Sequence, residues 1–258
     1  MKLQNKIALI TGGNSGIGLA TAKLFVSEGA RVAIIGRNQA SLDKAAKDLG
    51  PNVLAIRADI ADYSAMSQAI ETTVQRFNGK LDIIFANAGI SDATPLGATE
   101  IEKFENILRV NVTSVFAMLQ SCRPHLNNNA SIILNGSVMS INGRPGFSAY
   151  AASKGAIRAM GRVLASELSP LRVRVNVVSP GAVDTPIWSP LADTPEKTTA
   201  LFARLGKAIP LERIADSSEV AKAVLFLASE DSSYVQAAEI VVDGGSTGAP
   251  AGAPIYRG

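Results

Sequence analysis

The chain has 258 residues, enough to bury a full hydrophobic core yet few enough for a single domain spanning residues 1–258. One cysteine, Cys122, and one histidine, His125, exclude an internal disulfide and an ordinary zinc site, so no metal is expected among the functional residues. Lysine and arginine number 25 against 22 acidic residues and are scattered, which argues against a nucleic-acid partner.

No apolar run approaches the length of a membrane span, and the apolar stretch that begins at Ile7 is too short for a signal peptide. We therefore expect a cytoplasmic protein with no membrane partner.

Short apolar runs recur from one end of the chain to the other. Hydrophobic residues make up 47% of the sequence and aromatic residues 5%, a composition typical of buried parallel strands built from Ala, Val, Ile and Leu. Seven strands are predicted, at 6–10, 31–35, 52–56, 81–85, 130–134, 173–178 and 239–242.

Between these runs, apolar residues recur at three- and four-residue spacing, which predicts helices at 19–28, 63–77, 101–119 and 151–168. A further helix after Ala215 carries a capping signal, with Asp216 or Ser217 at its start and Glu219 just inside. Alternating strands and helices imply parallel pairing with right-handed crossovers. The predicted fold is α/β, a doubly wound seven-stranded parallel sheet of Rossmann-like type with helices on both faces.

Two stretches lack a clear core pattern. The segment 185–210 contains Pro186, Pro190 and Pro195 among apolar residues, and we interpret it as a substrate lid, with a rigid packed excursion as the alternative. The tail 247–258 is rich in Gly, Ala and Pro, which is typical of disorder, although Ile255 and Tyr256 could dock on a neighbouring subunit.

A glycine-rich loop, Gly12-Gly13-Asn14-Ser15-Gly16-Ile17-Gly18, follows the first predicted strand and opens a helix. Backbone N–H groups and the positive helix end can face a pyrophosphate there, and glycines allow its close approach. The spacing Gly-x-x-x-Gly-x-Gly differs from the commoner Gly-x-Gly-x-x-Gly fingerprint. In this strand–loop–helix context the loop nevertheless predicts a dinucleotide site.

The end of the second strand bears on the choice of nicotinamide cofactor, because an acidic residue there accepts a hydrogen bond from the ribose 2′-hydroxyl and repels a phosphate. This chain has Gly36-Arg37-Asn38, with no carboxylate and with a guanidinium that can bind a phosphate through several donors. NADP(H) is therefore favoured, with NAD(H) as the alternative. Ser15 and Asn38 can add neutral hydrogen bonds. Arg37 could instead be a solvated residue after the strand.

Tyr150 and Lys154 lie four residues apart, so that on a helix the phenol and the ammonium share one face. With Ser137 at the end of an apolar strand, they form a candidate proton-transfer group. No histidine stands near Ser137 in the pattern, which argues against a serine hydrolase. His125 is better interpreted as a surface residue at a helix end.

Taken in order, these motifs resemble the short-chain dehydrogenase/reductase family over residues 5–246. The turn that begins at Ala86 usually begins with asparagine in that family, but its other positions match. The remaining matching residues are Asp59, Asn87, Ala88, Gly89, Asn111, Ser137, Tyr150, Lys154, Pro180, Gly181 and Thr185.

The resemblance implies a bound nicotinamide cofactor. In the family, the residue matching Asp59 holds the adenine amino group, and the Asn-Ala-Gly turn supports the central strand beside the cofactor. The expected cofactor-binding residues are Gly12, Asn14, Ser15, Gly16, Ile17, Gly18, Arg37, Asn38, Asp59, Ile60, Asn87, Ala88, Gly89, Tyr150, Lys154, Pro180, Gly181, Val183 and Thr185.

It also implies a catalytic set of Asn111, Ser137, Tyr150 and Lys154. Tyr150 would donate a proton to a ketone oxygen or remove one from an alcohol, and Ser137 would orient the carbonyl and stabilise charge on its oxygen. Lys154 would bind the nicotinamide ribose. Together with the positive charge of an oxidised nicotinamide it would lower the pKa of Tyr150, which needs a shift of about three units, or about 4 kcal/mol, to ionise fully near neutrality. Asn111 would hold a water that links Lys154 to solvent, or would simply bond backbone across a helix kink.

A mostly apolar pocket beyond the nicotinamide favours a neutral ketone or secondary alcohol of moderate size as the small-molecule substrate. Arg144 could instead anchor a carboxylate or the phosphate of a carrier-bound acyl group, which keeps a 3-oxoacyl-thioester reductase in consideration, as does a sugar or polyol dehydrogenase. The candidate pocket residues are Val138, Met139, Phe147, Trp188 and Leu191.

Two other expectations follow from the family. A sensor that binds NADP(H) without turnover remains a minor alternative, because both Tyr150 and Lys154 are present. Relatives are commonly homotetramers in which two helices pack across a dyad, and one predicted helix carries small residues that permit such packing, namely Ala151, Ala152, Gly155, Ala156, Ala159 and Gly161.

Overall fold

A single parallel sheet organises the molecule. The computed structural model describes residues 1–188 and 192–257, and in this part of the chain seven strands pair in the order β3-β2-β1-β4-β5-β6-β7, all of them parallel. The predicted seven-stranded doubly wound sheet is confirmed. The strands are β1 (Ile7–Thr11), β2 (Arg31–Gly36), β3 (Val53–Arg57), β4 (Leu81–Ala86), β5 (Leu126–Asn135), β6 (Arg174–Pro180) and β7 (Glu239–Val242).

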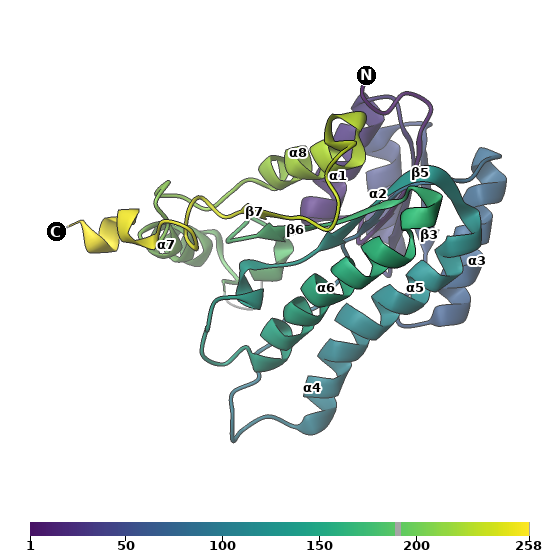
Figure 1. Cartoon of the computed structure of the whole chain (residues 1–258). Coiled ribbons are helices and arrows are strands. Elements are labelled where there is room, and N and C mark those ends of the chain that lie inside the picture. The colour runs from purple at the N-terminus through teal and green to yellow at the C-terminus, as the bar shows by residue number, and fades with distance from the viewer. Residues whose placement is uncertain (189–191, 258) are drawn as a thin grey trace.

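Helices cover both faces of this sheet (Figure 1). Buried side chains from α1, α2 and α8 form the core on one face, and those from α3, α5 and α6 form the core on the other. Within the described residues the α-helices are α1 (Gly16–Ser27), α2 (Gln39–Leu49), α3 (Tyr63–Phe77), α4 (Ile101–Leu108), α5 (Ser114–Cys122), α6 (Ser148–Glu167), α7 (Pro195–Gly206) and α8 (Ser217–Ala228).

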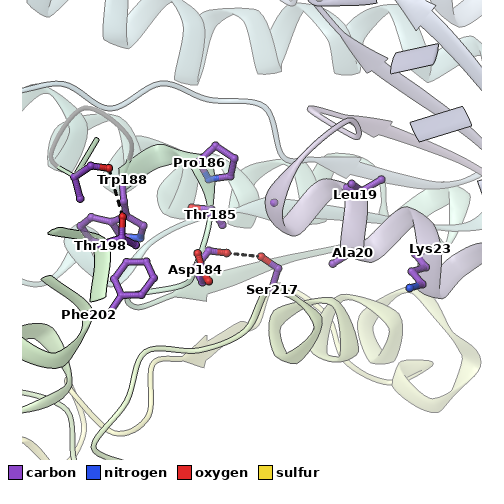
Figure 2. A pocket seen from close by; sticks show the side chains of 12 residues that line it. Leu19, Ala20, Lys23, Asp184, Thr185, Pro186, Trp188, Thr198, Phe202 and Ser217 are labelled. Atoms are coloured by element: carbon purple, nitrogen blue, oxygen red, sulfur yellow. Dashed lines mark hydrogen bonds between the residues drawn. The ribbon is translucent and has the colours of Figure 1, made fainter. Parts of the chain in front are cut away.

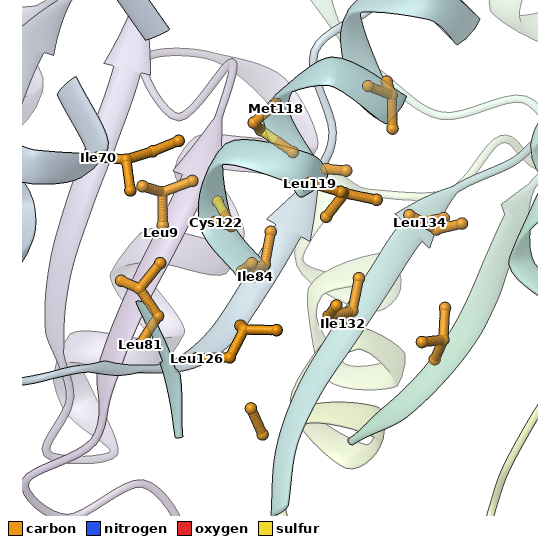
Figure 3. Close-up of a cluster of buried hydrophobic side chains, with 14 of the residues drawn as sticks. Leu9, Ile70, Leu81, Ile84, Met118, Leu119, Cys122, Leu126, Ile132 and Leu134 are labelled. Carbon is orange, nitrogen blue, oxygen red and sulfur yellow. The ribbon is translucent and has the colours of Figure 1, made fainter. Parts of the chain in front are cut away.

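The core is aliphatic, as the composition predicted. On the face covered by α3, α5 and α6, Leu9, Ile84 and Ile132 from the strands meet Met118 and Cys122 of α5 (Figure 3). Burial raises the pKa of the Cys122 thiol, because no charged partner compensates the loss of water. Cys122 therefore acts as a small apolar residue of the core rather than as a nucleophile.

The helix predicted at 101–119 is interrupted. A π-helical turn, Arg109–Thr113, separates α4 from α5 and contains the buried Asn111. The Asn111 side chain bonds the backbone of Ile90, which lies beyond the end of β4. A π-helical turn is wider than an α-helical one, and here it accompanies a polar side chain that bonds backbone outside the helix. The spacing of apolar residues does not predict such a turn.

The segment 185–210 is more regular than predicted, since it contains α7. Thr194 caps this helix by accepting a hydrogen bond from the Lys197 backbone N–H, and Pro195 occupies the first turn, where its missing N–H costs nothing. The proline that suggested irregularity thus marks the start of a helix. The role of the segment as a lid remains a prediction.

The C-terminal tail also folds onto its own chain, through two 3₁₀ turns, Pro250–Gly252 and Pro254–Tyr256. Arg257 pairs with Glu212 and donates to the carbonyl oxygen of Pro210, and Ala253 is fully buried. These contacts give the described residues of the tail a defined path along their own chain, without an α-helix or a strand. Figure 1 shows this tail beside α7, at the base of the predicted lid.

Candidate active site

The candidate site occupies the carboxyl edge of the sheet, at the point where the strand order reverses between β1 and β4. In open α/β sheets this reversal opens a crevice, because the loops after the two strands leave in opposite directions. A cavity of about 580 Å³ lies there. It is lined by Thr11, Gly12, Asn14, Ser15, Ile35, Gly36, Arg37, Asn38, Ala58, Asp59, Ile60, Ala88, Gly89, Ile90 and Val110.

The glycine loop forms one wall of this cavity. Gly12 has φ of +64°, a region that glycine adopts without strain, and a Cβ on Gly18 would lie 2.1 Å from the Gly12 carbonyl oxygen. Side chains at these positions would close the approach between the loop and the helix. The two glycines therefore allow the loop to pack closely against the first turn of α1.

The N-terminus of α1 is free to bind an anion. Ser15 is its N-cap, but the Ser15 side chain makes no capping hydrogen bond, and the first turn has no acidic residue. The first N–H groups of a helix need acceptors and carry partial positive charge. A dinucleotide pyrophosphate supplies both the acceptors and the compensating charge, so the loop fits this group.

At the end of β2, exposed Arg37 projects from the same cavity edge as Gly36. A Cβ on Gly36 would lie 2.5 Å from Asn14 Oδ1, and Asn14 Nδ2 donates to Ser41 Oγ at 2.8 Å. Asn38 is the N-cap of α2, its Oδ1 accepting from the Ser41 N–H at 2.9 Å. The end of β2 therefore carries neutral amides and one guanidinium, and it has no carboxylate that could accept a hydrogen bond from a ribose 2′-hydroxyl.

Asp59 and Ile60 line the same cavity after β3, next to the end of β2, where the Ala58 N–H donates to the Gly36 carbonyl oxygen at 3.0 Å. One Asp59 carboxylate oxygen, Oδ1, accepts a hydrogen bond from the Ala61 N–H at 2.9 Å, which fixes the side chain at the mouth. Ile60 is buried and presents an apolar surface. This combination suits the edge and the face of an adenine ring.

The turn after β4 is tied to the glycine loop by several hydrogen bonds. Thr11 Oγ1 accepts from the backbone N–H groups of Asn87 and Ala88, each at 3.0 Å. Asn87 Nδ2 donates to the carbonyl oxygens of Thr11 and Gly12, at 2.9 and 3.3 Å. These bonds hold the floor of the crevice rigid where β1 and β4 end.

Tyr150 and Lys154 project from one face of α6, as their spacing predicted. Lys154 Nζ lies 5.5 Å from the centroid of the Tyr150 ring and donates to the Asn135 carbonyl oxygen at 2.7 Å. Lys154 is only 5% exposed, and burial lowers its pKa to about 8. An ammonium held by a neutral carbonyl in a buried place gives up its proton more readily than a lysine in water.

Burial raises the pKa of Tyr150, and a hydrogen bond with Ser137 opposes this by favouring the tyrosinate. The lowering of the Tyr150 pKa that is expected from Lys154 and an oxidised nicotinamide together stays a prediction. Ser137 is itself buried at the end of β5, where its Oγ accepts from the Met139 N–H at 3.2 Å. At neutral pH Tyr150 is a protonated phenol beside a serine hydroxyl.

Asn111 is hydrogen-bonded to the backbone of the turn after β4, and its water-holding role stays a prediction. Its Oδ1 accepts from the Ile90 N–H at 2.8 Å, while its Nδ2 donates to the Ile90 carbonyl oxygen at 2.8 Å and to Ser153 Oγ at 3.0 Å. A Cβ on Gly89 would lie 3.1 Å from Asn111 Oδ1. The side chain thus pins the turn after β4 against α6, which is the backbone-bonding alternative.

The segment after β6 closes the crevice beyond Gly16. Thr185 packs close to Gly16, since a Cβ at position 16 would lie 3.0 Å from Thr185 Cγ2. Val183 is buried, and its carbonyl oxygen accepts from Trp188 Nε1 at 2.7 Å. Pro180 is the last residue of β6, and Gly181 follows it.

A second cavity, of about 550 Å³, lies behind this segment (Figure 2). Leu19, Ala20 and Lys23 of α1 face it from one side, and Trp188 and Phe202 face it from the other. Of the five candidate substrate-pocket residues, only Trp188 lines this cavity. Val138, Met139 and Phe147 come between Ser137 and Tyr150 in the sequence and do not line this cavity. Leu191 lies outside the described residues.

One residue with a central position, Asn135, is absent from the sequence-based prediction. It links two predicted residues, because its carbonyl oxygen accepts from Lys154 and its Nδ2 donates to Asn87 Oδ1 at 3.0 Å. The available signal is a polar residue at the end of an apolar strand, two positions before Ser137. That signal alone does not predict the hydrogen-bond partners of the Asn135 side chain.

In the part of the chain that the structure describes, no group of three or more His, Cys, Asp or Glu side chains could hold a metal ion. Over the same residues, no helix is both long and apolar enough to cross a membrane.

Known proteins resemble this chain over nearly its whole length. The family model described as enoyl-(acyl carrier protein) reductase matches residues 12–247. The chain is 39% identical to the 3-oxoacyl-(acyl-carrier-protein) reductase FabG of Thermotoga maritima, over 95% of this chain and 99% of that one. It is 37% identical to the 2-(R)-hydroxypropyl-CoM dehydrogenase of Xanthobacter autotrophicus, over 94% and 99% of the two chains.

An NADP-dependent (R)-specific alcohol dehydrogenase of Lentilactobacillus kefiri is 36% identical, over 95% of this chain and 98% of that one. Among solved structures, a short-chain dehydrogenase/reductase of the glucose/ribitol dehydrogenase type from Brucella melitensis superposes with a TM-score of 0.89 at 31% identity, covering 95% of this chain and 98% of that one.

Proposed function

This chain belongs to the short-chain dehydrogenase/reductase family and is an oxidoreductase, and we propose that it uses NADP(H) to interconvert a ketone and a secondary alcohol, with Tyr150 as the acid–base group. The observation that carries the proposal is the position of Tyr150, within hydrogen-bonding reach of Ser137, with buried Lys154 one turn along α6. All three lie at the carboxyl edge of the sheet, beside the crevice with the free helix N-terminus.

The chemistry divides between the chain and the cofactor, which supplies or accepts the hydride when bound. In reduction, Tyr150 Oη donates its proton to the carbonyl oxygen, and Ser137 Oγ–H donates a hydrogen bond to the same oxygen as negative charge develops. The raised pKa of Tyr150 keeps this proton in place at neutral pH. Oxidation uses the tyrosinate as the base, so we expect the rate of alcohol oxidation to rise with pH.

NADP(H) is supported by charge at the end of β2. Arg37 lies at the cavity edge, Gly36 offers no carboxylate, and Asn14 and Asn38 are neutral. A guanidinium binds a phosphate through two parallel charge-assisted hydrogen bonds. The NADP-dependent alcohol dehydrogenase named above is consistent with this preference, which we extend to this chain as a proposal.

A 3-oxoacyl-thioester reductase is the second candidate. Arg144 is exposed, and its guanidinium lies 5.0 Å from the centroid of the Phe147 ring, three residues before Tyr150. A cation held on an aromatic face near the acid–base residue can bind the anionic part of a carrier. The similarity to a 3-oxoacyl-(acyl-carrier-protein) reductase favours the same candidate.

The test is consumption of NADPH, and separately of NADH, followed by absorbance with a panel of aryl ketones, diketones, keto esters, sugars and 3-oxoacyl thioesters. Turnover with NADPH and one ketone class is the expected result. Tyr150→Phe should lower kcat by about 10²- to 10⁴-fold, the usual contribution of a general acid, with cofactor affinity nearly unchanged. Tyr234→Phe, at a fully exposed tyrosine, is the matched control and should retain full activity. Normal turnover by Tyr150→Phe contradicts the assigned role.

A further inference from the structure

Asn135 connects the cofactor crevice to Lys154 through a continuous set of hydrogen bonds. From the glycine loop, the carbonyl oxygens of Thr11 and Gly12 accept from Asn87 Nδ2. Asn87 Oδ1 then accepts from Asn135 Nδ2 at 3.0 Å, and the Asn135 carbonyl oxygen accepts from Lys154 Nζ at 2.7 Å. β1, β4, β5 and α6 are joined by this path.

Hydrogen-bond chemistry fixes the orientation of each amide along the path. Carbonyl oxygens only accept, so the Nδ2 group of Asn87 must face Thr11 and Gly12, and its Oδ1 must face Asn135. The partner at that point has to be a donor. Asn135 supplies it, whereas an aliphatic residue at the end of this strand would leave Asn87 Oδ1 without this donor, and Asn87 would be held by its Nδ2 bonds alone.

The second atom of the Asn135 amide gives an independent reason to assign it a function. Asn135 Oδ1 is buried and has no hydrogen-bond partner among the described residues. A buried acceptor without a partner destabilises the folded state. A leucine, which branches at the same carbon and has the same number of side-chain heavy atoms, would avoid this cost, so the asparagine is not explained by stability alone.

We propose that Asn135 is a positioning residue for cofactor binding, whose side-chain amide holds Asn87 in the orientation that shapes the glycine loop while its backbone holds Lys154. The inference rests on the proposed nicotinamide site. Asn135 makes no contact with reacting atoms in this role. It acts through Asn87, and its loss should be felt mainly as weaker cofactor binding.

The experiment measures NADPH binding to the substrate-free protein by energy transfer from Trp188, the single tryptophan, to the nicotinamide. Asn135→Leu should raise the dissociation constant about 3- to 10-fold, the effect of one lost hydrogen bond. The melting temperature without cofactor should stay within about 2 °C of wild type, because removing the orphaned Asn135 Oδ1 offsets the loss of the donor to Asn87.

A matched control comes from Asn176 on β6, which is fully buried but satisfied, its Nδ2 donating to the Val235 carbonyl oxygen and its Oδ1 accepting from the Ala238 N–H. Asn176→Leu should lower the melting temperature and leave NADPH binding unchanged. Opposite behaviour of the two variants separates positioning from general packing. Asn135→Ala serves as the second variant if leucine prevents folding.

A double-mutant cycle tests whether Asn135 acts through Asn87. Asn87→Ser should weaken NADPH binding, and adding Asn135→Leu should weaken it no further. Additive effects, or an unchanged dissociation constant in Asn135→Leu and Asn135→Ala, overturn this inference while leaving the proposed function intact. Failure of the wild-type protein to bind either NADPH or NADH overturns the proposed function and this inference with it.

Discussion

At the residue scale, the burial of Lys154 has a measurable effect on stability. Its pKa falls from the ordinary 10.5 to about 8 because the folded chain removes the ammonium from water. Between these two values the unfolded chain binds more protons than the folded one, so the stability of the folded state rises with pH. Below about pH 8 the buried Lys154 ammonium beside Tyr150 therefore lowers the stability of the folded state.

We therefore predict that Lys154→Met is more stable than wild type at pH 7 by up to about 3 kcal/mol, the equivalent of the pKa shift, and that the gap closes by pH 10.5. Urea unfolding of both proteins at several pH values measures this difference. Lys23→Met, at an exposed lysine of α1, is the control and should show no comparable change. A difference that is constant between pH 7 and 10.5 contradicts the prediction.

A second residue-scale prediction concerns the cofactor phosphate. Gly36→Asp combined with Arg37→Ala should shift the ratio of kcat/KM for NADPH to that for NADH by about 10- to 100-fold or more towards NADH, because a charge-assisted pair is lost and a repulsive carboxylate is gained. A Cβ at position 36 would lie 2.5 Å from Asn14 Oδ1, so the Asn14 side chain, which is bonded to Ser41 Oγ, has to shift to accept the aspartate. Steady-state kinetics with both cofactors give the ratio.

Arg76→Ala, at an exposed arginine in the last turn of α3, is the control for a general loss of positive charge. It should leave the ratio of the two cofactors unchanged. An unaltered ratio in the double variant would show that Arg37 does not bind the phosphate.

At the scale of elements, α1 and α8 begin in opposite ways. α8 has a full capping box, in which Asp216 accepts from the Ser218 N–H and Glu219 accepts from the Asp216 N–H. The N-cap of α1, Ser15, makes no side-chain capping bond. The first helix is stabilised by the core alone at its N-terminus, which leaves its N–H groups available to a ligand.

This contrast predicts different costs for the two caps. Asp216→Ala should lower the free energy of unfolding by about 1 kcal/mol, whereas Ser15→Ala should change it by less than about 0.5 kcal/mol in the absence of cofactor. Urea unfolding of the cofactor-free variants provides the comparison. Equal losses would mean that Ser15 does cap α1 in solution.

At the scale of the whole molecule, we predict a homotetramer in which α5 and α6 of two subunits pack across a twofold axis. These helices lie side by side on one face (Figure 1), and Phe116 and Val163 on them are 42% and 56% exposed. A Cβ on Gly155 of α6 would meet nothing within 4 Å, so this backbone is open to close approach by a partner.

Gly155→Arg is the variant that tests the interface. A single subunit has room for the arginine, and replacing a glycine within a helix favours the helix, so the fold should persist. Between two packed helices the same side chain would prevent close contact. Light scattering at micromolar concentration should give a tetramer for wild type and for the control Tyr63→Arg on α3, and a smaller species for Gly155→Arg. A monomeric wild type refutes the prediction.

The sequence by itself determined the elements and the residue types of the site. Hydrophobic periodicity gave the seven strands and most helices, since burial on a parallel sheet and on one helix face imposes periods that survive in a single sequence. Spacing alone put Tyr150 and Lys154 on one face of a helix. Glycine at positions 12 and 18 indicated a loop whose backbone packs too closely for a side chain. The capping box of α8 was readable because its bonds are local.

Only the tertiary structure decided how these residues meet. The bonds of Asn111 to the Ile90 backbone, of Lys154 to the Asn135 carbonyl oxygen and of Asn135 to Asn87 all join residues far apart in the chain. The raised pKa of Tyr150 follows from burial by several elements together. Burial and long-range hydrogen bonds depend on which strand ends converge at the carboxyl edge, and local spacing carries no record of those distances.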